Sequence, residues 1–433
     1  MINQIQGIVI MTTMACAMCC AVESAEPKVD LPAPYGVTPS ERQVKHAELE
    51  YYGFCHFTVD TFTDREWGLG TESESVFNPV QFDADQIVGA MKSAGMKGVI
   101  LTCKHHDGFC LWPSEMTEHD IASSPYKTGK GDIVKEFADA CSKAGIKFGV
   151  YLSPWDRNHP FYGKPEYIQV YRNQLRELLT GYGDIFEIWM DGANGGTGYY
   201  RGKVGPVEYK GELENRSIDR TTYYDWPNTW ALMRELQPKA VLFSDVGPDI
   251  RWVGNERGDA GDPCRATINY DPGDSPGNLD ISRLGTGDLG GKTWCQAEVD
   301  VSIRPGWFWH ASQDMKVKSP EDLMEIYLKS VGRGATLLLN CPPDKRGLLH
   351  ENDVDYQVAS ALASDVIAEK SFQCITESTY ACAVERLKRC DTMLNCLTGY
   401  GETNRANQRL AAAAEQLGLR VVKNYDEIVE AIG

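Results

Sequence analysis

Ionisable and aromatic side chains of this chain follow apolar segments that have the length of buried strands. One such segment, Ile185 to Met190, is rich in β-branched and aromatic residues and runs directly into Asp191 and Gly192. A carboxylate at the end of a buried strand is costly to desolvate unless it is paired or used in chemistry. The ends of the other predicted strands supply further polar or aromatic residues: His56, Lys104, His105, His106, Asp107, Tyr151, Trp155, Asp156, Asp245, Glu298 and Asp300.

This set of side chains suits the hydrolysis of a glycosidic bond. One carboxylate attacks or stabilises the anomeric carbon, and a second protonates the leaving oxygen and later activates water. Tryptophan faces stack on the apolar side of a sugar ring, while histidines and Arg bind its hydroxyl groups. A lone histidine at the end of a strand is otherwise a structural residue, so the prediction rests on the whole set.

A metal site is the alternative chemistry for His105, His106 and Asp107. Adjacent residues of a strand point to opposite faces, so both histidines are not expected to bind one ion. No phosphate-binding glycine motif follows a predicted strand, which argues against a nucleotide site. We therefore predict neither a metal nor a cofactor.

Two similar junctions indicate how these residues are positioned. Residues 94–99 and 144–150 each contain a glycine that ends a helix and an apolar strand that follows at once, which is typical of a parallel sheet. The pattern predicts helices and strands along most of the chain. The predicted helices are 84–94, 131–144, 165–179 and 319–331, and the predicted strands are 51–57, 98–103, 146–152, 185–190, 241–244, 294–299 and 335–339.

The helix–strand alternation is regular in the first half of the chain and irregular in the second. Residues 194–226 and 254–292 are rich in Gly, Asp and Tyr and lack a helical period. We predict a (β/α)8-like (TIM) barrel that is irregular in its second half, rather than an open doubly wound sheet. Such a barrel brings the carboxyl ends of its strands to one rim, where catalytic residues lie.

The termini differ from this central region. Residues 7–22 are apolar and too short to span a bilayer comfortably, so 1–25 is predicted to be a signal peptide cut after Ala21 or Ala25. Lipid attachment at Cys16, Cys19 or Cys20 remains an alternative, and the predicted location is secreted or periplasmic. Residues 40–366 form the predicted barrel domain, and 367–433 form a short, mostly helical C-terminal tail of unknown role.

Charge and cysteine content limit the classes of partner. The chain of 433 residues carries 43 Lys and Arg against 61 Asp and Glu, a net charge of −18, which argues against nucleic acid or anionic membrane as a partner. No second apolar segment is long enough for a membrane span. Among the 14 cysteines, buried free thiols are expected at Cys55, Cys103 and Cys110, and Cys374, Cys382, Cys390 and Cys396 are candidates for pairing. No oligomeric state is predicted.

Five motifs occur in order along the chain: residues 53–57, Glu66-Trp67, residues 104–112, residues 153–156 and residues 187–192. Together they resemble glycoside hydrolase family 29, the α-L-fucosidases. The resemblance runs in order from about residue 40 to 355, and the segment from Gly247 to Glu256 resembles the branch that acts on α-1,3/1,4-linked fucose. Many members of this family continue from the barrel into a β-sandwich, whereas the tail here is predicted to be helical and short.

This resemblance implies a retaining exo-glycosidase that removes terminal α-L-fucose from fucosylated glycans by double displacement. Asp191 is then the nucleophile and Glu256 the acid/base, with Glu298 as the second candidate for the acid/base. The expected fucose-binding residues are His56, Glu66, Trp67, His105, His106 and Trp189, with Arg251 and Trp309 nearby, and Tyr151 is added from its place at a strand end.

Two other functions remain open at this point. One is a lectin-like barrel that binds fucose without turnover, which the presence of both carboxylates argues against. The other is a retaining hydrolase of a different sugar such as galactose, which carries a hydroxymethyl group where fucose has a methyl. A panel of aryl glycosides distinguishes these functions.

Overall fold

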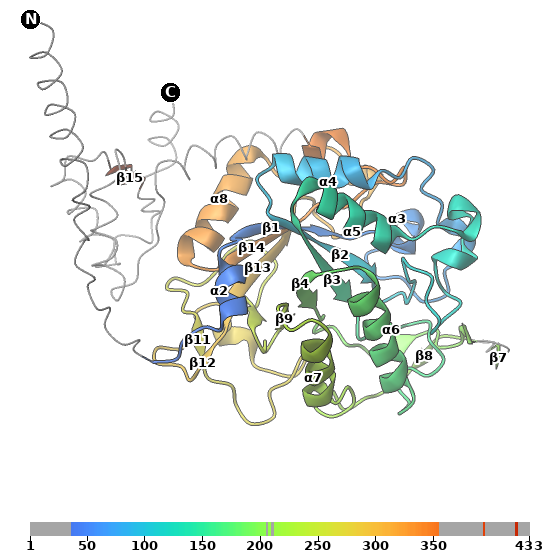
Figure 1. Cartoon of the computed structure of the whole chain (residues 1–433), viewed down its shortest axis with the longest axis horizontal. Coiled ribbons are helices and arrows are strands. Elements are labelled where there is room, and N and C mark those ends of the chain that lie inside the picture. Colours follow the sequence, from blue (N-terminus) through green and yellow to red (C-terminus); the bar gives the residue numbers. More distant parts are fainter. Residues whose placement is uncertain (1–35, 205–206, 209–211, 355–392, 395–420, 423–433) are drawn as a thin grey trace, which may run out of the picture. The chain divides into compact units, whose positions relative to one another are not determined.

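A computed structural model describes residues 36–204, 207–208, 212–354, 393–394 and 421–422. Eight parallel strands close into a barrel in the order β1-β14-β13-β10-β9-β4-β3-β2 (Figure 1). The barrel lies in the larger of two compact units, Pro39–Gly433; the other is Met1–Thr38. The predicted (β/α)8-like fold is confirmed. Its strands are β1 (Tyr51–Cys55), β2 (Gly98–Lys104), β3 (Lys147–Leu152), β4 (Ile185–Trp189), β9 (Val241–Ser244), β10 (Ile250–Trp252), β13 (Gln296–Ser302) and β14 (Thr336–Asn340).

Helices surround the barrel in Figure 1, and several begin at residues whose side chains cap them. Asp83 accepts from the backbone N–H of Gln86, and Asp132 does the same for Lys135. Gly145 ends its helix at a φ of +73°, a conformation that favours glycine. The helices are α2 (Glu41–Ala47), α3 (Val59–Thr63), α4 (Ala84–Ser93), α5 (Ile133–Ala144), α6 (Tyr167–Gly181), α7 (Trp226–Leu236) and α8 (Pro320–Ser330).

One barrel strand and three helices are not among the elements predicted from the sequence. Strand β10 has three residues, too few to show a strand period, and begins two residues after a Gly247-Pro248 turn. Helix α2 precedes the first predicted strand, α3 is a five-residue helix that follows it, and α7 follows a segment without helical period. Among the described residues, no α-helix joins β9 to β10 or β10 to β13, which accounts for the irregular second half.

The barrel has an inner and an outer layer of apolar side chains. Along β2, Val99 and Leu101 pack toward the helices, whereas Ile100 between them belongs to the cluster inside the barrel, as alternation along a strand requires. Aromatic rings dominate the inner cluster, so a rigid floor lies beneath the rim. Its buried members are Tyr52, Phe54, Ile100, Tyr151, Trp189, Val241, Phe243, Ile250 and Leu338.

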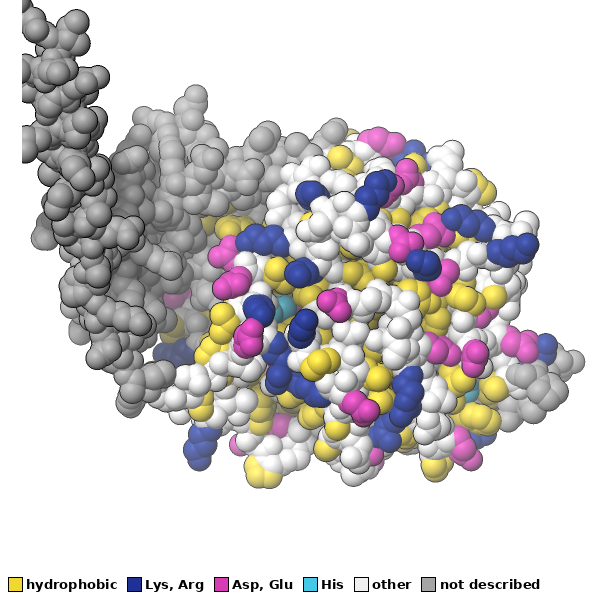
Figure 2. All heavy atoms as spheres, viewed as in Figure 1, with side chains coloured by type: hydrophobic (Ala, Val, Ile, Leu, Met, Phe, Trp, Pro, Cys, Tyr) yellow, Lys and Arg dark blue, Asp and Glu magenta, His cyan; other side chains and the backbone are white. Residues whose placement is uncertain are grey.

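Helix α2 closes the amino-terminal end of the barrel. Gln43 donates to the backbone oxygens of Asp249 and Trp294, each at 3.0 Å, and these residues lie just before β10 and β13. Figure 2, seen from the same side as Figure 1, shows Lys and Arg side chains gathered around this end. They include Lys147 and Lys239, which line a hollow beside α2. The negative charge of the chain is therefore not spread evenly, and this end is basic.

Within the described ranges, four two-stranded sheets lie outside the barrel. β5 (Thr197–Gly198) pairs with β8 (Glu214–Asn215), and β6 (Lys203–Val204) with β7 (Val207–Glu208). β11 (Thr267–Ile268) pairs with β12 (Thr293–Trp294), and β15 (Met393–Leu394) with β16 (Val421–Val422).

Some sequence predictions fall wholly or largely outside the described residues. These are the signal peptide 1–25, nearly all of the helical tail 367–433, and the four C-terminal cysteines. In the described part of the chain, no helix combines the length and the apolar character needed to cross a membrane. The predicted free thiols Cys55, Cys103 and Cys110 are confirmed, and all three are buried.

Candidate active site

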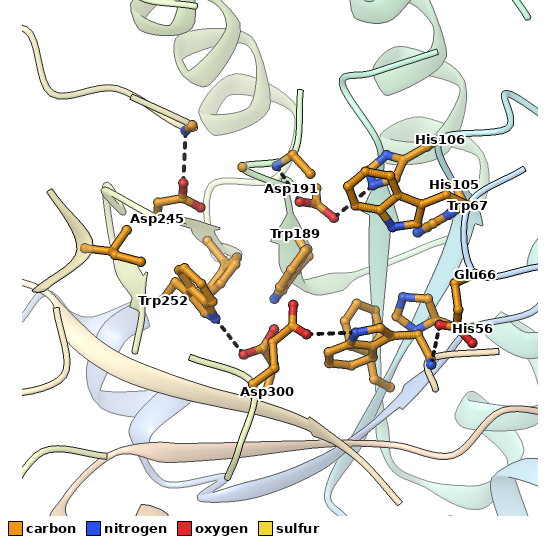
Figure 3. Close-up of a pocket in the computed structure, with 18 of the residues that line it drawn as sticks. His56, Glu66, Trp67, His105, His106, Trp189, Asp191, Asp245, Trp252 and Asp300 are labelled. Atoms are coloured by element: carbon orange, nitrogen blue, oxygen red, sulfur yellow. Dashed lines mark hydrogen bonds and ion pairs between the residues drawn. The ribbon is translucent and has the colours of Figure 1, made fainter. Parts of the chain in front are cut away.

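A cavity of about 290 Å³ opens at the carboxyl ends of the barrel strands. Its walls come from loops that follow strands far apart in the sequence, as Figure 3 shows. Eight of the residues predicted from the sequence line this cavity: His56, Glu66, Trp67, His105, His106, Trp189, Asp191 and Glu256.

Asp191 lies two residues beyond β4 and is held at both carboxyl oxygens. The backbone N–H of Ala193 donates to Oδ1 at 2.7 Å, and the Tyr151 hydroxyl donates to Oδ2 at 3.0 Å. His106 Nε2 lies 3.6 Å from Oδ2, the contact drawn in Figure 3. Burial, with the charges of Asp245 and Glu256, raises the pKa of Asp191 to about 7, and the two donors oppose this rise. A held carboxylate of this kind can attack an electrophilic carbon.

Tyr151 is fully buried and does not line the cavity, so its predicted contact with the sugar is corrected. Its side chain lies in the inner layer of the barrel and reaches the site only through the hydroxyl bonded to Asp191. Tyr151 therefore positions the carboxylate.

Gly192 permits a close approach between the ends of β4 and β9. A Cβ atom at this position would lie 2.1 Å from Oδ2 of Asp245, the carboxylate that accepts from Gly277 N at 2.9 Å. Any larger residue would displace the loop that carries Asp191. The glycine of the Met190-Asp191-Gly192 motif thus sets the position of the neighbouring carboxylate.

His105 and His106 lie side by side, with ring centroids 4.2 Å apart, and both line the cavity. The expectation that they would point to opposite faces is wrong, because β2 ends at Lys104 and the alternation of a strand ends with it. Ser153 Oγ donates to the Trp155 carbonyl, so it accepts from Nδ1 of His106 at 2.7 Å. The Nε2 atom of neutral His106 is then free to accept a hydrogen bond from a hydroxyl group.

All three cavity histidines are held neutral by burial. Burial lowers the pKa of His105 to about 3, and burial together with neighbouring histidines lowers the pKa of His56 and His106 well below 6.5. His56 Nδ1 lies 2.9 Å from Oδ1 of Asn340, whose amide nitrogen donates to the Trp307 carbonyl at 2.7 Å. Neutral histidines bind hydroxyl groups without repelling positive charge at an anomeric carbon.

Glu66 joins the loop after β1 to the loop after β13. Its Oε2 accepts from the Trp307 backbone N–H at 2.7 Å, and its Oε1 lies 2.5 Å from His310 Nε2. The adjacent Trp67 is half exposed and sets its ring edge-on to His106, with centroids 5.3 Å apart. The pair forms part of the cavity rim, with an aromatic face available to a ligand.

Glu256 lies four residues beyond β10 and is exposed at the cavity mouth. The Trp307 indole donates to its Oε2 at 3.2 Å. Asp300, at the end of β13, accepts from the Trp252 indole at 2.7 Å (Figure 3). Burial and the charge of Glu256 raise the pKa of Asp300 well above 3.8, so a second carboxyl lies close to Glu256. This side of the cavity can supply a proton to a leaving group.

Three further assignments from the sequence are corrected. Arg251 is fully buried and donates to the backbone oxygens of Leu284, Arg265 and Cys295, because it points away from the cavity that its neighbour Trp252 lines. Trp309 does not line the cavity, and its indole donates to Asp314 at 3.1 Å. Glu298 lies wholly inside the barrel, below the cavity, and cannot be the acid/base.

Several lining residues were missed as site residues. Asp245 and Asp300 belonged to the set at strand ends, and Trp307 lies two positions from the predicted Trp309, so their residue types could have identified them as site residues. Trp252 could be assigned to the cavity only once β10 was known to be a strand. The remaining missed members come from loops whose sequence gives no signal: Arg220, Leu279 and Ile281.

Other polar residues of the motifs have structural roles. Lys104 is buried and its Nζ donates to Asp156 at 3.1 Å, Tyr167 at 3.0 Å and Gln174 at 2.9 Å. Asp107 accepts from Thr58 at 3.0 Å and from the Phe109 N–H at 2.6 Å. Within the described residues, two clusters have the composition and spacing to hold a metal ion: Asp60, His105 and Asp107, and His46, Glu187 and Glu298.

Comparisons with known proteins identify the family of the chain. A family model described as alpha-L-fucosidase matches residues 37–359, about three quarters of the chain. The chain belongs to the α-L-fucosidase family. The family predicted from the motifs is therefore confirmed. A glycoside hydrolase 29 family member from a rumen bacterium is 47% identical with a TM-score of 0.72, and the match covers 77% of this chain and 58% of that one.

Two more relatives extend the comparison. Alpha-L-fucosidase 1 of Arabidopsis thaliana is 44% identical, over 79% of this chain and 64% of the relative. A glycoside hydrolase 29 fucosidase of Ruminococcus gnavus in complex with fucose is 32% identical with a TM-score of 0.66, over 78% of this chain and 69% of that one. The chain thus spans about three fifths of the length of its rumen bacterial and plant relatives. A second family model, the MJ0874 family, matches residues 346–429.

Proposed function

We propose that this chain is a retaining exo-α-L-fucosidase that releases terminal α-L-fucose from glycans. The observation that carries the proposal is one cavity at the barrel rim that holds Asp191, Glu256 and three neutral histidines in a member of the α-L-fucosidase family. The bound fucose of the Ruminococcus gnavus relative supports the same sugar here.

In the proposed mechanism, Asp191 attacks the anomeric carbon while protonated Glu256 donates a proton to the leaving oxygen. The bond from C1 to the leaving group breaks as the bond to Asp191 forms. Glu256 then takes a proton from water, which attacks C1 and releases Asp191. The two carboxyl groups are expected to lie about 5–5.5 Å apart when the sugar is bound. The Ala193 backbone N–H and the Tyr151 hydroxyl hold the attacking carboxylate.

The acidic lining of the cavity suits this reaction. Its carboxyl groups belong to Glu66, Asp191, Asp245, Glu256 and Asp300, against the single cation Arg220 among the lining residues. Positive charge develops at the anomeric carbon in the transition state, so the carboxyl groups that are ionised lower the barrier. A site with several cations would do the opposite.

We further propose a preference for α-1,3/1,4-linked fucose. Its support is the segment from Gly247 to Glu256, which resembles that branch of the family. The segment contains β10, Trp252 and Glu256, so it forms one wall of the cavity. Beyond it, Leu279 and Ile281 offer an apolar surface to the sugar that leaves.

Hydrolysis of 4-nitrophenyl α-L-fucoside beside a Lewis-type trisaccharide tests the activity and the linkage together. The expected result is fucose from both, with a higher kcat/KM on the trisaccharide, and α-L-fucose as the first anomer detected by proton NMR. A panel of aryl glycosides serves as the control. Release of galactose in preference to fucose, or fucose binding without any hydrolysis, would favour the alternative functions and contradict the proposal.

We also propose that the chain is exported, because residues 7–22 have the length and apolar character of a secretory signal. Expression in a bacterial host followed by N-terminal sequencing tests this. The expected mature chain begins at Val22 or Glu26. A cytoplasmic product that retains Met1 would contradict export.

A further inference from the structure

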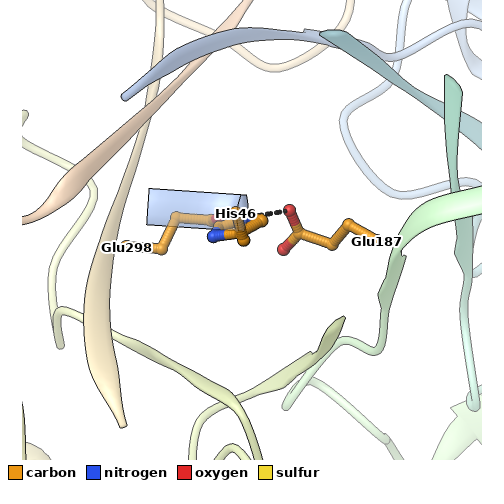
Figure 4. A group of neighbouring side chains, drawn as sticks. All are labelled: His46, Glu187 and Glu298. Carbon is orange, nitrogen blue, oxygen red and sulfur yellow. Dashed lines mark hydrogen bonds and ion pairs between the residues drawn. The ribbon is translucent and has the colours of Figure 1, made fainter. Parts of the chain in front are cut away.

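Four polar side chains meet inside the barrel, below the cavity, and the proposed mechanism uses none of them. His46 comes from α2, Tyr52 from β1, Glu187 from β4 and Glu298 from β13, and all are buried. Figure 4 shows His46, Glu187 and Glu298 gathered within the ring of strands. Ligand atoms of these three residues lie within 4.8 Å of one another.

Hydrogen bonds join this cluster into a network. His46 Nε2 lies 2.7 Å from Oε2 of Glu187 and 3.1 Å from the Tyr52 hydroxyl. Tyr52 in turn donates to Oε2 of Glu298. Burial lowers the pKa of His46 to about 4, so this imidazole is neutral at physiological pH. The cluster therefore contains two carboxyl groups and no compensating cation of its own.

Two adjacent buried carboxyl groups cannot both ionise, so at least one of the pair keeps its proton. Burial raises the pKa of Glu187 to about 8, and burial with the nearby Glu187 raises the pKa of Glu298 well above 4.5. Both oxygens of Glu298 accept a hydrogen bond, whereas Oε1 of Glu187 has no partner. Two hydrogen-bond donors, the Tyr52 hydroxyl and the Trp189 indole, thus converge on Glu298.

Glu298 connects this cluster to the cavity through Trp189. The Trp189 indole donates to Oε1 of Glu298 at 2.8 Å, and Trp189 lines the cavity two residues before Asp191. Its ring is stacked between Phe243, at 4.3 Å, and Tyr151, at 5.3 Å. Two stacked rings and one hydrogen bond therefore fix the orientation of the indole.

We propose that Glu298 is a positioning residue for the reaction, one that holds the Trp189 indole in a fixed orientation at the floor of the cavity. This role rests on the proposed fucosidase function. Trp189 ends β4 and Asp191 lies two residues beyond it, so an indole that turns in its place also moves the attacking carboxyl group. A misplaced nucleophile raises the barrier more than it weakens binding, so the contribution falls mainly on kcat.

Two substitutions test the hydrogen bond to Trp189. Glu298→Gln keeps an oxygen that can accept from the indole and is expected to leave kcat within about threefold of the parent. Glu298→Leu removes the acceptor and is expected to lower kcat about tenfold or more, with a smaller change in KM. Glu177→Gln is the matched control, because Glu177 accepts from the Trp112 indole at 2.8 Å outside the cavity, and it should leave kcat unchanged.

A spectroscopic measurement reads the role of Glu298 without turnover. In protein labelled with 15N-tryptophan, the Nε1–H signal of Trp189, assigned with Trp189→Phe, should lie downfield and move upfield in Glu298→Leu. An unmoved signal would overturn the positioning role. If the unsubstituted chain hydrolyses no fucoside, the proposed function fails, yet this signal still decides whether Glu298 holds the indole.

Two other results would also overturn the inference. Wild-type kcat in a folded Glu298→Leu variant would exclude a role for the hydrogen bond to Trp189. One divalent metal per chain, measured on the purified protein and lost in Glu298→Leu, would show that His46, Glu187 and Glu298 bind an ion instead of forming a hydrogen-bonded cluster. Thermal melting of each variant shows whether the substituted chain is folded.

Discussion

The Tyr151 hydroxyl donates a 3.0 Å hydrogen bond to Oδ2 of Asp191 across two neighbouring barrel strands. The Tyr151 side chain does not line the cavity, yet its hydrogen bond affects the pKa of Asp191. Burial raises the pKa of Asp191 to about 7, and the Tyr151 donor lowers it. The nucleophile and its neighbour in the barrel wall therefore act as one unit.

Removing this donor should change the pH dependence of catalysis. Asp191 must be ionised to attack, so kcat/KM should rise with pH through a value near 7. In Tyr151→Phe the lost hydrogen bond raises the pKa of Asp191, and the acidic limb should move upward by roughly half to one pH unit. Tyr171→Phe, which removes a buried hydroxyl bonded to the Leu152 carbonyl, is the control. A downward shift in Tyr151→Phe would contradict this account.

Trp307, rather than Trp309, is expected to serve the proposed acid/base. The Trp307 indole donates to Glu256, so Trp307→Phe should free that carboxyl and lower kcat/KM about tenfold. Trp309→Phe removes only a bond to Asp314 and should stay within about twofold of the parent. Steady-state kinetics on an aryl fucoside measures both. Equal losses of kcat/KM in the two variants, or a larger loss in Trp309→Phe, would show that Trp309 takes part in catalysis or substrate binding.

Gly192 is expected to tolerate no side chain. In Gly192→Ala the new Cβ meets the Asp245 carboxylate, which displaces the loop of Asp191 and should lower kcat by roughly 10²-fold. Gly89→Ala is a matched change in helix α4, where a Cβ meets nothing within 4 Å, and it should stabilise the fold by about 0.5–1 kcal/mol. Kinetics and urea unfolding measure the two effects. Full activity in Gly192→Ala would show that the two strand ends move apart freely.

Lys104 should matter for stability rather than for binding. Lys104→Met leaves the buried Asp156 without its cation and should cost roughly 3–5 kcal/mol in the free energy of unfolding. Lys135→Met, which breaks an exposed pair with Asp139 on α5, should cost less than about 0.5 kcal/mol. Thermal and urea unfolding test both. Equal stability of the two variants would mean that Lys104 is not the partner that stabilises Asp156.

The sequence predicted the parts of this molecule that local patterns encode. Asp83, Asp132 and Gly145 mark helix ends, and seven of the eight barrel strands follow from apolar runs of at least four residues. Strand β10 was not predicted because three residues are too few to show a period. Without this strand the sequence did not show that Trp252 faces the cavity and Arg251 faces away from it.

The site residues also divide into those that local sequence patterns locate and those that depend on the closed fold. Asp191, His56, His105 and His106 directly follow strands, so their place at the rim could be inferred from the fold. Whether Trp307 or Trp309 lines the cavity depends on the conformation of one loop, which cannot be predicted from the residue types. The role of Glu298 could not be inferred either, because its partners come from two other strands and a helix that only the closed barrel brings together.

The central claim is that Asp191 is the nucleophile and Glu256 the acid/base at one anomeric carbon, and azide rescue tests it most directly. In Asp191→Ala, activity on 4-nitrophenyl α-L-fucoside should fall by roughly 10³-fold or more and be partly restored by azide, which bonds to C1 as the nitrophenolate leaves and yields the β-fucosyl azide. In Glu256→Ala, azide should instead attack the fucosyl-enzyme and yield the α-fucosyl azide. The opposite anomers, or full activity without azide in Asp191→Ala, would contradict the assignment.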